Sequence, residues 1–159
     1  MNVEIICIGK LKEKYWRDAS AEYAKRLGRF CRFKITELKE SRLPENASAA
    51  DEETVKYKEG EEILKALKKQ QYVVALDIRG TEIDSEKLAA RLDRLMTSGT
   101  SDVAFIIGGS LGLSQDVISR ADFRLSFSPM TFPHQMMRII LQEQLYRCFK
   151  IIHNEAYHK

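Results

Sequence analysis

Short apolar runs alternate with longer amphipathic segments along this chain, and this pattern predicts strands that alternate with helices. Each run holds five to seven residues and is rich in β-branched or aromatic residues, as VEIICI and VAFII illustrate. Strands are predicted over residues 3–8, 32–38, 72–77, 103–107 and 123–127. The run at 103–107 is wholly apolar, which predicts the most deeply buried strand of the set.

The segments between these runs place apolar residues at helical spacing. In LKEKYWRDASAEYAKRLG, apolar and aromatic residues from Leu11 to Leu27 fall on one stripe, which predicts a first helix. Ser48 lies three residues before Asp51, an N-cap signature, and Ser85 is predicted to cap another helix. The later helices are predicted over residues 49–69, between 85 and 99, over 114–120 and over 134–152.

Strands that alternate with helices throughout predict an α/β fold with a mostly parallel sheet and helices on both faces. The length of 159 residues is typical of one domain, so a single domain is expected over residues 1–159. In such sheets ligands bind beyond the carboxyl ends of the strands. The loops that begin at Leu76, Gly108 and Phe127 are therefore the first candidates for a binding site.

Composition narrows the class of protein. Apolar residues make up 44% of the chain and charged residues 31%, with no repeat and no block of like charge, so a disordered or fibrous protein is not expected. No apolar run approaches the roughly 20 residues of a membrane span, and Glu4 interrupts the first one. We expect neither secretion nor membrane insertion, but a cytoplasmic protein.

The three cysteines, Cys7, Cys31 and Cys148, are odd in number and widely separated. This spacing fits neither a disulfide framework nor the paired ligands of a zinc site. We interpret them as small apolar residues of the core in a reducing compartment, and no metal site is predicted.

The net charge of +3 does not identify an RNA-binding protein by itself, but its distribution is informative. Lys10, Lys12 and Lys14 crowd the start of the first helix, where cations oppose the helix macrodipole and a phosphate partner would offset the cost. A second group follows at the end of this helix, where cations are favourable without any partner. It comprises Lys25, Arg26, Arg29 and Arg32.

The glycine-rich segment IIGGSLGL, residues 106–113, follows the fourth predicted strand. Its glycines are not spaced as G-x-G-x-x-G, and it lacks the Lys-Ser/Thr pair of a P-loop. Two interpretations stay open: a tight turn that needs positive φ, or a close approach of the backbone to a ligand without phosphates.

The segment SFSPMTFPHQMMR, residues 126–138, leads from the fifth strand into the last helix. Its two prolines stiffen the loop, and Pro133 lies where a helix start tolerates proline. With Phe127, Phe132 and Met130 this loop can form a slot for a flat heteroaromatic ring and a sulfur-containing tail. A plain connector whose side chains simply pack is the alternative.

IIGGSLGL, LSFSPMTFPHQMMRIILQEQLYR and the closing EAYHK, in this order and spacing, resemble the ribosomal RNA large subunit methyltransferase H family of the SPOUT superfamily. The resemblance extends over the whole chain from CIGKLKEKYW onward. It implies a C-terminal trefoil knot, S-adenosylmethionine bound in that knot, and a homodimer. By position, it places cofactor contacts at Leu76, Gly108, Phe127, Ser128, Pro129, Met130, Thr131 and Phe132. Position 111 is leucine where a polar residue is expected in relatives.

The same resemblance implies methylation of N3 of a pseudouridine in 23S rRNA, in the stem-loop that touches the small subunit of assembled ribosomes. The tail is expected to reach the partner subunit's site, where His158 positions the RNA or accepts a proton and Tyr157 stacks on an extruded base. Arg138 is expected near the mouth of the site, holding a phosphate or supporting an N3 anion. His134 is interpreted as a helix-start residue rather than a catalyst, and His153 as solvated surface.

Two other functions remain alternatives. One is a non-catalytic, ribosome-associated RNA-binding or assembly factor that kept the fold. The other is a SPOUT methyltransferase that acts on tRNA. Neither alternative involves DNA or a membrane.

Overall fold

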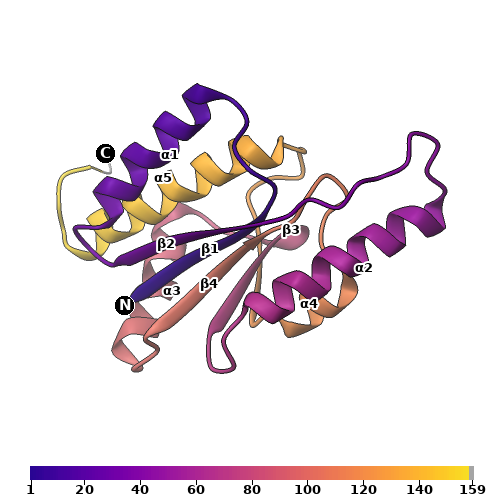
Figure 1. Cartoon of the computed structure of the whole chain (residues 1–159). Helices are drawn as coiled ribbons and strands as arrows, with labels where there is room; N and C mark the ends of the chain where they lie inside the picture. The colour runs from indigo at the N-terminus through magenta and orange to yellow at the C-terminus, as the bar shows by residue number, and fades with distance from the viewer. Residues whose placement is uncertain (158–159) are drawn as a thin grey trace.

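The computed structural model describes residues 1–157, in which strands and helices alternate as the sequence predicts (Figure 1). The strands are β1 (Asn2–Ile8), β2 (Arg32–Leu38), β3 (Tyr72–Glu82), β4 (Asp102–Ile107) and β5 (Phe123–Ser126). The helices are α1 (Lys14–Leu27), α2 (Ala49–Ala66), α3 (Ser85–Thr97), α4 (Gln115–Arg120) and α5 (His134–Ile152). None of these helices is both long and apolar enough to cross a membrane.

The strands form one sheet in the order β2-β1-β4-β3-β5, and every pair is parallel. Helices α1, α3 and α5 cover one face, whereas α2 and α4 cover the other (Figure 1). The larger core joins Leu27, Leu92 and Phe149 to the sheet, and the smaller core joins Ile63 and Val117 to its other face. The predicted α/β fold with helices on both faces is confirmed.

Strand β3 is longer than predicted. The apolar run ends at Asp77, but the strand continues to Glu82. Leu125 of β5 is paired with both Leu76 and Thr81, so residues 77–80 bulge out of the ladder between them. A Cβ on Gly80 would stand 2.7 Å from the carbonyl oxygen of Arg124, which shows how tightly the bulge lies against β5.

Helix starts follow the predicted chemistry with one exception. Ser48 forms the expected capping box with Asp51 at α2. At α3 the cap is Asp84, whose side chain accepts a hydrogen bond of 2.7 Å from the Lys87 backbone N–H. The prediction of Ser85 is wrong by one residue, because Asp84 has the extended backbone of an N-cap and Ser85 is already helical.

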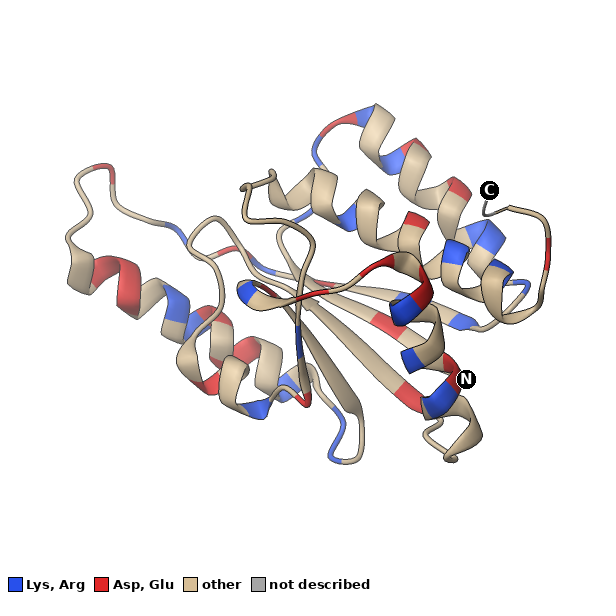
Figure 2. Ribbon diagram, turned by 180° about the vertical axis from the view of Figure 1, so that it is seen from behind, with Lys and Arg blue, Asp and Glu red and all other residues tan. Residues whose placement is uncertain are grey.

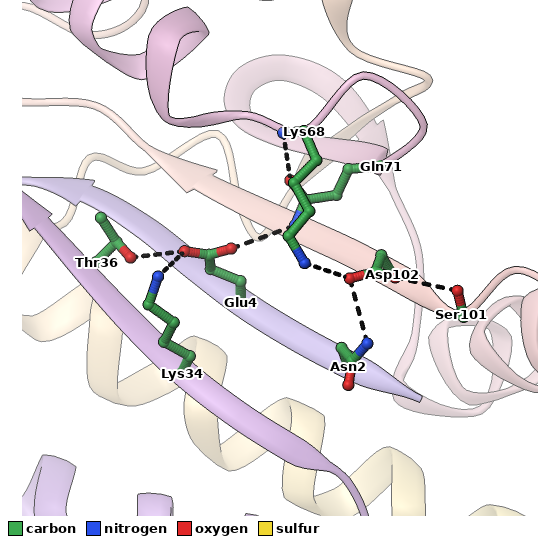
Figure 3. A network of polar contacts seen from close by, with 8 residues as sticks. All are labelled: Asn2, Glu4, Lys34, Thr36, Lys68, Gln71, Ser101 and Asp102. Atoms are coloured by element: carbon green, nitrogen blue, oxygen red, sulfur yellow. Dashed lines mark hydrogen bonds and ion pairs between the residues drawn. The ribbon is translucent and has the colours of Figure 1, made fainter.

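A polar network holds the amino ends of the strands together (Figure 3). Glu4 on β1 accepts hydrogen bonds from Thr36 (2.6 Å), Lys34 (3.0 Å) and Gln71 (3.3 Å). Burial raises the pKa of Glu4, but these three donors outweigh it, so that the net pKa is lowered. The network lies at the edge of the sheet opposite to the loops after β3, β4 and β5, so we assign it to stability.

The cysteines occupy core positions, as interpreted from the sequence. Cys7 and Cys148 are fully buried, Cys31 is partly buried, and all are free thiols. Burial raises the pKa of Cys7 and of Cys31 to about 11 and that of Cys148 to about 12. The thiols are therefore protonated at neutral pH, which does not suit a nucleophile.

Candidate functional site

A cavity of about 600 Å³ lies at the carboxyl edge of the sheet, where β3, β4 and β5 end. This volume is within the usual range for a small-molecule site. Seven of the eight positions expected to contact a cofactor line it, and Pro129 does not. The seven are Leu76, Gly108, Phe127, Ser128, Met130, Thr131 and Phe132. The structure thus brings together three loops that are far apart in the sequence.

The loop after β5 is fixed by its own polar groups. Ser128 Oγ accepts a hydrogen bond of 2.9 Å from the Met130 backbone N–H, and Ser126 Oγ donates one of 3.3 Å to the Ser128 carbonyl. Pro133 is the N-cap of α5, and its carbonyl accepts from the Met137 N–H at 2.9 Å. The loop therefore presents its side chains to the cavity from a restrained backbone.

The glycine-rich turn closes on itself. A Cβ on Gly108 would stand 2.7 Å from the Gly112 carbonyl oxygen, and the Gly112 N–H donates to the Gly109 carbonyl at 3.1 Å. Gly112 has a φ of 81°, so the tight-turn interpretation holds at this residue. Gly108 has no side chain and lines the cavity, whereas Leu111 is not part of its wall.

The bulge of β3 forms a wall that the sequence did not predict. Asp77 lines the cavity and accepts hydrogen bonds from Arg124 Nε (2.9 Å) and Nη2 (2.5 Å). Ile78, which follows it, is 52% exposed, and Met130 on the neighbouring loop is 72% exposed. Two large apolar side chains thus line the cavity while still open to solvent. The polar sequence after Asp77 gave no sign that the strand continues.

Arg138 does not lie at the mouth of this cavity, where the sequence analysis expected it. Its side chain is 1% exposed and donates hydrogen bonds to Glu37 Oε1 (2.5 Å) and to the Gly9 carbonyl (2.9 Å). Its Nε has no partner within residues 1–157. A buried, paired guanidinium cannot hold a phosphate in this arrangement, but it does fix the start of α5 against the ends of β1 and β2.

Tyr157 does not line the cavity of its own chain. Its hydroxyl donates to Glu143 Oε2 at 2.9 Å, and its ring lies beneath the Arg147 guanidinium, 4.7 Å from it. Glu143 and Arg147 follow Met137, the last residue of α5 in the cavity wall, by about 9 and 15 Å along the helix axis at 1.5 Å per residue. His158 lies outside the described residues. The structure therefore does not bring Tyr157 together with the cofactor positions.

His134, in contrast, lines the cavity. Its Nε2 lies 3.8 Å, and Glu40 Oε2 3.7 Å, from the point where a Cβ on Gly9 would stand. Gly9 has a φ of 81°, which favours glycine in this turn, whereas a Cβ would make only ordinary van der Waals contact with the imidazole. The Lys12 N–H donates to Gln135 Oε1 at 2.9 Å, which fastens the lysine-bearing loop after β1 beside the cavity.

Comparison with known proteins agrees with this geometry. A family model described as "Predicted SPOUT methyltransferase" matches residues 1–158. The chain belongs to the SPOUT methyltransferase family. This SPOUT methyltransferase is 55% identical to "Ribosomal RNA large subunit methyltransferase H" of Alkaliphilus oremlandii (strain OhILAs), over 100% of both chains. It is 54% identical to the protein of the same name from Clostridium novyi (strain NT), again over 100% of both chains.

A solved structure is similar in fold. It is described as a probable methylase family protein from Haemophilus influenzae Rd KW20 and matches with a TM-score of 0.54. The match covers 99% of this chain and 70% of that one, at 15% sequence identity. At this identity the likeness concerns the fold alone.

Proposed function

We propose that this SPOUT methyltransferase transfers a methyl group from S-adenosylmethionine to N3 of a pseudouridine in 23S rRNA. The substrate is the stem-loop that touches the small subunit, within assembled ribosomes in the cytoplasm. The observation that carries the proposal is the single cavity formed by the three strand-end loops, in a chain similar over its full length to proteins named ribosomal RNA large subunit methyltransferase H.

The residues of the cavity fit the cofactor. Phe127, Phe132 and the exposed Met130 supply apolar and polarisable surface for an adenine ring and a thioether-like tail. Asp77 places a negative charge in the cavity wall, which suits a cationic ligand. When bound, S-adenosylmethionine supplies a methyl group on a positively charged sulfur, which is electrophilic without further activation. The protein's task is then to orient the acceptor nitrogen and to exclude water.

The neutral base carries a proton on N3, so transfer needs a proton acceptor or a group that stabilises the N3 anion. Among the described residues, His134 and Asp77 are the titratable side chains of the cavity wall. Asp77 is already engaged by Arg124. We therefore assign to His134 the role of proton acceptor. The tail residues Tyr157 and His158 keep the role of positioning RNA.

A homodimer is part of this proposal. Tyr157 contacts Glu143 and Arg147 and does not line the cavity of its own chain, so in this proposal the tail positions RNA at the partner's cavity. Helix α1 offers a surface for association, because Tyr15 is 61% exposed and lies edge-on to Trp16, with ring centroids 4.9 Å apart. In this proposal the chain around β5 forms the expected trefoil knot. The knot holds the loops after β4 and β5 around one cofactor molecule. Light scattering of the purified protein tests the dimer.

The charges of the protein are compatible with RNA as the partner. Basic and acidic residues are interspersed along the ribbon (Figure 2), in agreement with the modest net charge. Lys10 and Lys12 form no ion pair within the described part of the chain, and their loop lies beside the start of α5. We assign them to the phosphate backbone of the substrate.

Mass spectrometry of 23S rRNA tests the function. RNA from cells that lack this protein should have lost N3 methylation at the target pseudouridine, and unchanged methylation contradicts the proposal. Calorimetry with S-adenosylmethionine separates an enzyme from a non-catalytic assembly factor, which binds neither the cofactor nor its homocysteine product. Methyl transfer to purified ribosomes compared with tRNA decides between the two substrates.

A further inference from the structure

A second hollow of about 440 Å³ lies beside the cavity, on the other side of the glycine-rich turn. Ser110 lines both spaces, so the two sites are direct neighbours. The remaining lining residues come from the loop after β2, from α2 and from the turn itself. They are Glu40, Ser41, Arg42, Leu43, Val55, Glu59 and Leu111.

Glu59 is the unusual feature of this hollow. The residue is 4% exposed, and its Oε1 accepts a hydrogen bond of 2.9 Å from the Ser41 N–H. Within residues 1–157 its Oε2 accepts no hydrogen bond and no cation pairs with it. Burial raises the pKa of Glu59, and the nearby Glu40 adds to this, while the Ser41 N–H acts in the opposite direction. This oxygen can therefore accept a hydrogen bond from a donor that enters the hollow.

Two glycines hold the carboxylate in this position. A Cβ on Gly60 would stand 2.1 Å from Ser114 Oγ, so glycine lets α2 lie directly against the start of α4. A Cβ on Gly109 would stand 3.0 Å from Glu59 Oε2, so glycine in the turn keeps this oxygen uncovered. The close packing of α2 against the turn therefore places an open acceptor in the wall of the hollow.

The rest of the hollow supplies two further kinds of contact. Arg42 is exposed and forms no ion pair within the described residues, so its guanidinium is available to a phosphate. Leu43 is 39% exposed and, with Val55 and Leu111, offers an apolar surface. An acceptor, an apolar surface and a free cation match the amino group, the ring face and the phosphate of one nucleotide.

We propose that this hollow binds an unpaired nucleotide of the RNA substrate that neighbours the methylated base. Glu59 Oε2 accepts a hydrogen bond from the exocyclic amino group of its base, the ring lies on Leu43 and Leu111, and Arg42 binds its phosphate. This inference rests on the proposed function, because it takes the cavity on the other side of the turn as the site of the target base. It also accounts for a leucine at position 111, which forms this surface and not the cavity wall.

Photo-crosslinking tests the site without requiring methylation. The photoreactive residue p-benzoylphenylalanine replaces Leu43, purified ribosomes are irradiated with the variant, and primer extension maps the crosslinked nucleotide. The control carries the same group at Tyr57, which is 53% exposed on α2 but does not line the hollow. We expect the Leu43 variant alone to crosslink to an rRNA nucleotide next to the methylated one. Absence of this crosslink, or equal crosslinking from Tyr57, overturns the proposal.

Glu59→Gln tests the chemistry of the contact. Glutamine can still accept from the Ser41 N–H, but it presents an NH₂ group to the hollow and repels an amino donor. We expect about tenfold weaker ribosome binding with unchanged affinity for S-adenosylmethionine. Arg42→Ala should also weaken ribosome binding, whereas the exposed Glu61→Gln should not. If Glu59→Gln leaves the affinity for ribosomes unchanged, this inference is contradicted but the proposed function is not. If the Leu43 variant crosslinks but the wild-type protein transfers no methyl group, the proposed function is contradicted and this inference is not.

Discussion

Arg138 and Gly9 are joined by a hydrogen bond of 2.9 Å from the guanidinium to the carbonyl oxygen. The two residues are 129 positions apart, yet this bond fastens the start of α5 to the loop after β1. Glu37 on β2 accepts the second hydrogen bond of the same guanidinium. One buried side chain thus fixes the relative position of three segments next to the cavity.

Replacement of Arg138 by methionine should lower the free energy of unfolding by about 3 kcal/mol, because it leaves Glu37 and the Gly9 carbonyl without their buried donor. Arg138→Lys should recover only part of this loss, since an ammonium cannot donate in the same fork. Urea unfolding at constant protein concentration measures both variants. The exposed Arg29→Met serves as control, with an expected change below about 0.5 kcal/mol. A loss for Arg138→Met no larger than the control contradicts the anchoring role.

The loop after β5 gives a prediction that separates two neighbouring positions. Phe132 lines the cavity and Pro129 does not, although the sequence resemblance assigned both to the cofactor. Phe132→Ala should weaken S-adenosylmethionine binding about tenfold through lost apolar contact. Pro129→Ala should change it less than threefold, since only loop stiffness is altered. Calorimetry provides the dissociation constants of both variants. A larger loss of affinity for Pro129→Ala than for Phe132→Ala would mean that the cofactor contacts a different part of the loop.

His134→Asn should lower the rate of single-turnover methyl transfer to ribosomes about 100-fold, as expected for loss of a proton acceptor. The variant should keep its affinity for S-adenosylmethionine. His153→Asn is the matched control, because His153 packs near Phe30 at the far end of α5. A slower rate that is accompanied by weaker binding of S-adenosylmethionine indicates a structural helix-start role instead.

Most of the fold could be predicted from the sequence because the strands are short apolar runs between clear helical patterns. The continuation of β3 could not, since residues after Asp77 are held by pairing with Leu125 and not by their own apolar pattern. The position of the cavity was predicted from the strand ends. The places of Asp77 and Ile78 in its wall were not predicted, because they depend on the bulge in β3. Arg138 was misplaced because its burial depends on Glu37 and Gly9, whose proximity only the folded sheet creates.

Glu4 should make stability depend on pH. Its pKa is lowered from the ordinary value of 4.5. The contribution of Glu4 to the free energy of unfolding is therefore present above pH 4.5 and is lost as the pH falls through the lowered pKa. Glu4→Gln should reduce the free energy of unfolding by roughly 1 to 2 kcal/mol at pH 7, and the difference should shrink in acid. Urea titrations at several pH values measure this, with Glu62→Gln of an exposed pair as control. A difference that grows in acid contradicts the lowered pKa.

Removal of His158 and Lys159 separates the two roles that the tail can have. If the tail of each subunit positions RNA at the partner's cavity, the truncated protein should bind S-adenosylmethionine normally but transfer methyl groups at least about tenfold more slowly. Tyr157→Phe removes only the hydrogen bond to Glu143, so it should retain a ring for stacking and most of the activity.

Mixed dimers provide the decisive comparison. When one subunit carries His134→Asn and the other lacks the tail, each cavity has one defect if the tail acts in its own chain, so no site is intact. If the tail acts across the dimer, both defects fall in one cavity and the other cavity is intact. The mixed dimer in which one subunit carries both changes is the reciprocal control: it retains one intact site if the tail acts within the chain and none if the tail acts across the dimer.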